Sequence, residues 1–161
     1  MNQTHIHLLI THLPIIGAML GALVLAYGIW KKSNPTLVAA YNVLILSAIG
    51  ACIGYMTGEG AEEAVEHMQG VSERVIEAHE ESAQVSLIAL AVVATLAFLG
   101  IYLTQVKSRL TRRIAVCTLT ASIVGFALVA RTGYLGGKIR HAEEIGIKAS
   151  PVKEGNEKDN D

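Results

Sequence analysis

Four long apolar runs constrain this chain more than any other feature of its sequence. They cover residues 6–30, 36–57, 83–106 and 114–136, and polar or charged segments separate them. An α-helix needs about 20 predominantly apolar residues to cross the hydrocarbon core of a bilayer. The sequence therefore predicts four transmembrane helices. It excludes a soluble globular enzyme, a secreted disulfide scaffold and a nucleic-acid-binding protein.

The length of the chain suits a single domain. It has 161 residues, and only 17% of them are charged, against about a quarter in an average soluble domain. We expect residues 1–147 to form the transmembrane domain and residues 148–161 to form a polar, flexible tail. The first run lacks a preceding basic region and is longer than the apolar part of a signal peptide, so we expect it to remain as a span.

The basic residues predict the orientation in the membrane. The segments after the first and third runs contain Lys31, Lys32, Lys107, Arg109, Arg112 and Arg113. All 14 acidic residues lie in the other polar segments. The positive-inside rule places the basic loops in the cytoplasm. We therefore expect a multi-pass protein of the bacterial inner membrane with both termini in the periplasm.

The loop lengths predict an all-α membrane protein, a four-helix up-down bundle. The two basic loops are short, so consecutive helices should be antiparallel neighbours. The longer acidic segment 58–78 has helical periodicity and predicts a short outer amphipathic helix between the second and third spans. The chain also reads as two helix-pair repeats. Each repeat has a Thr-Gly segment, beginning at Thr57 and Thr132, that is followed by a histidine.

The histidines are the strongest candidates for chemistry. All six lie in the outer part of the sequence pattern. His12 lies among apolar residues of the first run, and His79 opens the third helix as its counterpart. The first and third helices of such a bundle are diagonal, so two imidazoles at equal depth could hold a flat macrocycle between them. Bis-histidine ligation of haem b needs that arrangement.

Glycines and one arginine extend this hypothesis. Gly50, Gly54 and Gly58 form a stripe on the second helix that could admit a porphyrin edge; the alternative is tight helix–helix packing. Arg131 lies inside the fourth run, where it could pair with a haem propionate or a quinone oxygen. The alternative for Arg131 is extension toward the lipid headgroups.

A second site is also open. His5 or His7 could hold a second haem or a metal ion together with His67 or His141. Solvated terminal histidines are the favoured alternative for His5 and His7, and an equal alternative for His67 and His141. Histidine and glutamate recur together around His67, His79 and His141, and imidazole with carboxylate suits zinc, iron or manganese. The same acidic run could instead be a docking surface for a basic electron carrier.

Several motifs resemble those of a bacterial four-helix membrane family of unknown function. They are the His-x-Pro opening in Thr11–Gly17, the segment Gly54–Gly58, His79, and the Thr-Gly-x-x-Gly-Gly ending that leads to His141. The resemblance covers most of residues 5–147. Leu13 replaces the usual aromatic residue, and Ala142 replaces a frequent glycine. Some members of this family are fused to Rieske-type domains, which implies redox surroundings.

The sequence thus predicts a membrane b-type cytochrome with one haem, or two. It would transfer electrons between a quinol pool and a periplasmic carrier or a larger redox complex. Expected partners are membrane lipid, other redox subunits and further copies of the chain, with no nucleic acid. The sequence contains no nucleophile–base arrangement and no phosphate loop, which favours a non-catalytic subunit over a stand-alone enzyme. A His/Glu metal-binding membrane protein and a cofactor-free structural subunit remain alternatives.

Overall fold

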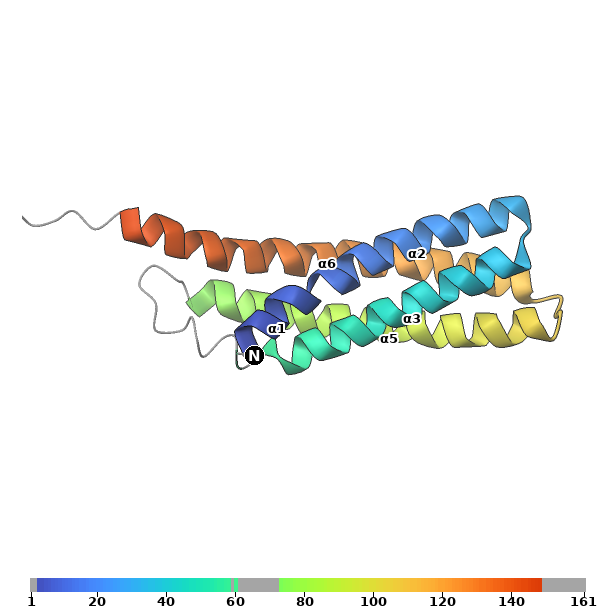
Figure 1. Cartoon of the computed structure of the whole chain (residues 1–161), viewed down its shortest axis with the longest axis horizontal. Helices are drawn as coiled ribbons and strands as arrows, with labels where there is room; N and C mark the ends of the chain where they lie inside the picture. Colours follow the sequence, from blue (N-terminus) through green and yellow to red (C-terminus); the bar gives the residue numbers. More distant parts are fainter. Residues whose placement is uncertain (1–2, 59, 61–72, 149–161) are drawn as a thin grey trace, which may run out of the picture.

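The chain folds into helices that run side by side along one long axis (Figure 1). The computed structural model describes residues 3–58, 60 and 73–148. Its helices are α1 (Gln3–Ile10), α2 (His12–Lys31), α3 (Asn34–Met56), α5 (Glu73–Gln105) and α6 (Thr111–Lys148). Helix α2 packs on α3 and α6, and α5 packs on the same two helices. This arrangement confirms the all-α up-down bundle, in which α2 and α5 are diagonal.

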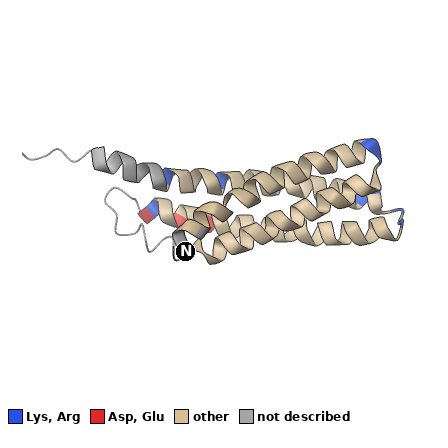
Figure 2. Ribbon diagram, in the orientation of Figure 1, with Lys and Arg blue, Asp and Glu red and all other residues tan. Residues whose placement is uncertain are grey.

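Four segments of the described chain are long and apolar enough to cross a membrane. They are His7–Lys31, Asn34–Met56, Glu73–Gln105 and Thr111–Ile139. They correspond to the four predicted spans and indicate a multi-pass membrane protein. In Figure 2 the acidic residues lie at one end of the bundle, and the opposite end carries only basic ones. We call these the outer and the inner end.

Small residues make up a large part of the interior of the bundle, and large apolar residues cover its surface. The buried face of α2 includes Gly17, Ala18, Gly21 and Ala22. Large side chains such as Trp30, which is 71% exposed, and Phe98, which is 60% exposed, point outward. Helices in lipid gain stability from close backbone approach because the lipid is as apolar as the side chains. The distribution is therefore that of a membrane bundle.

The first span is divided by a one-residue break at Thr11, between α1 and α2. Pro14 explains the break, because proline has no N–H to donate to the carbonyl of Ile10 and its ring clashes with that carbonyl. The sequence pattern predicted one continuous helix over 6–30. Thr11 keeps helical dihedral angles (φ −64°, ψ −19°), and α1 packs on α3.

Two features of the polar ends of the bundle bear on the sequence-based expectations. Helix α6 continues as one helix to Lys148, a length of about 57 Å at 1.5 Å per residue, whereas the hydrocarbon core is about 30 Å thick. The predicted outer amphipathic helix falls mostly on residues 61–72, which lie outside the described residues. So does the predicted tail, except for Lys148.

Candidate functional site

His7 packs on the outer end of α3. Its Nδ1 lies 2.9 Å from the carbonyl oxygen of Gly54 and 3.2 Å from Oγ1 of Thr57. A Cβ atom on Gly58 would lie 3.8 Å from Cε1 of the imidazole. The ring therefore lies where Gly58 has no side chain, against the carbonyl of the residue four positions earlier.

His79 on α5 has the same arrangement with α6. Its Nδ1 lies 3.0 Å from the carbonyl oxygen of Thr132. A Cβ atom on Gly136 would lie 3.1 Å from Cε1 of the ring. Gly136 again follows the carbonyl residue by four positions. In a helix this is the next residue up on the same face, and a glycine there leaves the carbonyl accessible to a side chain of another helix.

These contacts define which imidazole nitrogen is available. A backbone carbonyl can only accept a hydrogen bond, so Nδ1 of His7 and of His79 must carry the proton. The lone pair of the neutral ring is then on Nε2. Metal-ligating histidines are held in this way, with one nitrogen bound to a carbonyl and the other directed to the metal.

Buried hydroxyl groups follow His79 on α5, one and two turns toward the inner end. The Oγ atoms of Ser82 and Ser86 lie 2.8 Å and 2.9 Å from Oγ1 of Thr132. Both serines are buried. In α3, Ser47 is buried too, and its hydroxyl donates to the carbonyl of Pro14 at 2.9 Å. Every one of these hydroxyls has a partner, which is what hydrocarbon surroundings require.

His12, the predicted ligand on the first span, is the first residue of α2. It is exposed, and its Nδ1 lies 3.0 Å from the carbonyl of Leu8 in the preceding turn. The hydroxyl of Thr11 donates to the same carbonyl at 3.2 Å. The structure thus gives His12 a partner at the break in its own span.

The predicted glycine stripe is in contact with the first span. A Cβ atom on Gly50 would lie 2.9 Å from the side chain of Leu13, and one on Gly54 would lie 3.7 Å from Ile10. Gly50 and Gly54 are therefore close-packing positions in this structure, which is the alternative that the sequence left open. Arg131 is exposed on α6, so its guanidinium does not lie in the interior of the bundle.

The second predicted site lies largely beyond the described residues. His67 belongs to the undescribed segment, and of His141 only the helical backbone is described. Within the described part of the chain, His, Cys, Asp and Glu side chains form no group of three or more that could hold a metal ion. Exposed Glu80 and Glu81 follow His79, but they do not complete such a group.

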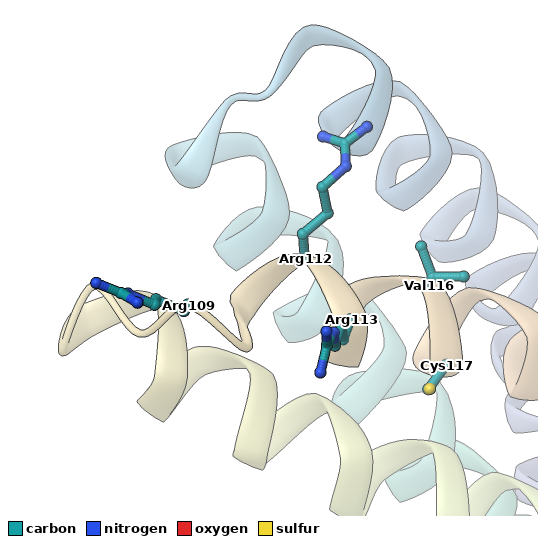
Figure 3. A pocket seen from close by; sticks show the side chains of 5 residues that line it. All are labelled: Arg109, Arg112, Arg113, Val116 and Cys117. Carbon is teal, nitrogen blue, oxygen red and sulfur yellow. The ribbon is translucent and has the colours of Figure 1, made fainter.

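The inner end carries a different kind of surface. A hollow beside the start of α6 is lined by Arg109, Arg112, Arg113, Val116 and Cys117, and Figure 3 shows the arginines spreading in different directions from it. Arg112 donates to the carbonyl of Ile29 at 3.0 Å and so closes the end of α2. Such a basic end is typical of the side of a membrane protein that stays in the cytoplasm.

Comparison with known proteins did not identify a relative of this chain. No family model matches the chain, and no curated protein or solved structure matches it significantly. The resemblance seen in the motifs therefore stays a prediction. The contacts of His7, Thr132, Ser82 and Ser86 were not predicted from the sequence. The sequence does contain a signal for His7. It precedes His79 by 72 positions, and Gly58 precedes Gly136 by a similar distance, 78 positions.

Proposed function

We propose that the chain is a small b-type cytochrome of the membrane. It would exchange electrons at the outer end of the bundle, between a quinol pool and a periplasmic carrier or a larger redox complex. One observation carries this proposal: two half-buried imidazoles at one end of the bundle have Nδ1 bound to a backbone carbonyl and Nε2 left with a lone pair. A bound haem would supply a one-electron Fe(III)/Fe(II) couple.

The donor set fits haem, whereas the predicted cradle does not. Neutral imidazoles held by carbonyls are the usual axial ligands of b-type haem, and His79 meets this requirement. The places beside Gly50 and Gly54 are filled by side chains of the first span. The proposed site therefore uses the imidazoles of the outer end and, from the glycine stripe, only the contacts of Gly54 and Gly58 with His7. Arg131 is exposed, so it would pair with a haem propionate only at the surface of the bundle.

The position of the proposed site indicates on which side of the membrane electrons would be exchanged. The three histidines with described hydrogen bonds, His7, His12 and His79, all lie in the outer part of their helices. With the orientation proposed from the basic loops, this end faces the periplasm. A single haem there exchanges electrons on one side of the bilayer. Exposed Glu73, Glu77, Glu80 and Glu81 start α5 at the same end, a charge pattern that favours a basic partner.

An absorbance experiment tests the proposal. The full chain is purified in mild detergent, its spectrum is recorded before and after dithionite reduction, and haem per chain is measured as the pyridine haemochrome. We expect a sharp α band on reduction. A preparation that stays colourless after haem supplementation would contradict the proposal.

The His79→Ala variant separates the alternatives. If the chain is a cytochrome, this variant loses the absorbance of low-spin haem. If it is a His/Glu metal-binding protein, the variant changes the metal content measured by mass spectrometry in a colourless protein. If the histidines only hold the bundle together, neither the absorbance nor the metal content changes.

A further inference from the structure

The two halves of the bundle bury equivalent positions. Between the first span and α5, the equivalent residues are 72 positions apart. Five such pairs are buried in both helices: Pro14 and Ser86, Ala18 and Leu90, Gly21 and Val93, Leu25 and Ala97, Gly28 and Gly100. A shared pattern of burial over four turns means that the two helices present the same face to the core at the same depth.

The other two helices are related in the same way. Between α3 and α6 the equivalent residues are 78 positions apart. Four pairs are buried in both: Leu37 and Ala115, Ala40 and Thr118, Leu44 and Ser122, Ser47 and Gly125. The same shift places Gly54 on Thr132 and Gly58 on Gly136. The two carbonyls that bind imidazoles are therefore equivalent, and so are the two glycines beneath the rings.

This correspondence identifies which histidine of the first span is equivalent to His79. The shift of 72 positions places His7 on His79, whereas it places His12 on the exposed Gln84. We propose that His7, and not His12, is the partner of His79, and that the two imidazoles together hold one haem iron at the outer end of the bundle. This inference rests on the proposed function and names its second ligand.

The symmetry of the bundle supports a single haem shared by His7 and His79. Two equivalent halves in an up-down bundle are related by a pseudo-two-fold axis along the bundle. Residues related by that axis lie at equal depth on opposite sides of it. A planar macrocycle on such an axis would meet an equivalent imidazole on each of its faces.

The local contacts distinguish His7 from His12 in the same direction. His7 is half-buried and bonded to another helix, as His79 is. His12 is exposed and bonded to the preceding turn of its own span. Orientation by a second helix fixes a ligand relative to the rest of the bundle, and this is what axial ligation requires.

Ligand replacement tests the pairing in the full chain. His7→Ala, His12→Ala and His79→Ala are purified in detergent, and haem per chain and the ferric spin state are measured by pyridine haemochrome and electron paramagnetic resonance. We expect the low-spin signal to be lost in His7→Ala and in His79→Ala and to return when free imidazole is added. His12→Ala is the matched control and should keep the low-spin signal of the wild type.

The outcomes separate this inference from the function on which it rests. If His12→Ala loses the low-spin signal and His7→Ala keeps it, the pairing is wrong and the cytochrome proposal survives. If the wild type is colourless after haem supplementation, both are overturned. Where an alanine variant does not fold, as judged by helicity and gel filtration, His7→Met and His79→Met replace it. Methionine can ligate haem iron, and each variant should raise the midpoint potential; unchanged potentials would contradict the pairing.

Discussion

The interior of the bundle differs between its inner and outer parts. Near the inner end the core is built from large apolar side chains, among them Leu25, Leu37, Leu44 and Val93, packed around Tyr41. Near the outer end the described interior contains Ser82, Ser86, the hydroxyl of Thr132 and the rings of His7 and His79. The inner part has buried hydroxyls too, but those of Thr104 and Thr118 bind a carbonyl of their own helix. The outer part has polar groups that pair with another helix.

This difference shows which part holds the fold and which part can carry chemistry. A polar group inside a membrane protein is costly unless it is paired, and ionisable groups there are functional candidates by default. The outer part contains such groups with ordered partners. The inner part contains one buried polar atom without a partner, Oη of Tyr41, within the described residues. We therefore expect substitutions in the inner part to change stability and substitutions in the outer part to change ligand binding.

The largest expected effect is that of Gly100→Ala in the inner part. A Cβ atom there would contact Cζ of Tyr41 and lie 2.7 Å from its Oη. Tyr41 is fully buried and cannot move away, and overpacking of this kind costs about 1–3 kcal/mol. We expect a loss near the upper limit, measured as the midpoint of SDS-induced unfolding by circular dichroism. Gly137→Ala is the control, because a Cβ atom there meets nothing within 4 Å. Equal midpoints for Gly100→Ala and the wild type would contradict the distinction between an inner part that determines stability and an outer part that binds the ligand.

The next effect is that of Thr132→Val in the outer part. It removes the hydroxyl that pairs with both Ser82 and Ser86, and we expect a loss of about 1–2 kcal/mol from two interhelical hydrogen bonds. His79 binds the backbone carbonyl of Thr132, so the haem spectrum should not change. Thr95→Val is the control, because the Thr95 hydroxyl is exposed and binds only within its own helix. An altered spectrum in Thr132→Val would show that the hydroxyls belong to the ligand site.

A comparison of two equivalent glycines sharpens the outer site. A Cβ atom on Gly136 would press on the ring of His79 at 3.1 Å, whereas one on Gly58 would make an ordinary contact with His7 at 3.8 Å. Displacing an oriented ligand commonly costs about tenfold in affinity. We expect Gly136→Ala to weaken haem retention by about that factor, measured as transfer to apomyoglobin, and Gly58→Ala to retain haem as the wild type does. The opposite order would contradict the contacts at His79.

The smallest expected effect is a gain of stability. Tyr41→Phe removes the buried hydroxyl that has no partner in the described structure, and the ring itself is kept. We expect the free energy of SDS-induced unfolding to rise by about 1 kcal/mol. Tyr102→Phe is the control, because Tyr102 is 61% exposed. A less stable Tyr41→Phe variant would mean that the hydroxyl has a partner in the membrane, and the inner part would then not be purely a scaffold.

Much of the fold could be predicted from the sequence because hydropathy is a local property. The four spans and their antiparallel order follow from run lengths and loop lengths, and the structure confirms them. The break at Thr11 was also predictable, since Pro14 is visible in the sequence, but the pattern of apolar residues alone conceals it. The break matters because it separates His7, which precedes it, from His12, which follows it.

The contacts of the histidines could not be predicted in the same way. Which side chain faces another helix depends on helix rotation, and a rotation of one residue moves a side chain by about 100° around the axis. The glycines were similarly ambiguous, because a missing side chain suits both a cofactor and a neighbouring helix. In the structure, the contacts of Gly50 with Leu13 and of Gly54 with Ile10 favour the neighbouring helix. The partner of His79 stays a prediction that the ligand replacements will test.

The separation of small interior residues from large surface residues has a consequence for protein design. Exposed side chains such as Leu23, Phe98 and Ile123 contribute to solubility in lipid, while the close approach of the helices depends on Gly17, Gly21 and their neighbours. The two sets of positions scarcely overlap, so each can be rewritten without the other. Replacing the outward-facing residues by charged ones should convert the bundle into a water-soluble protein that keeps its interior, in which the outer imidazoles could be studied without detergent.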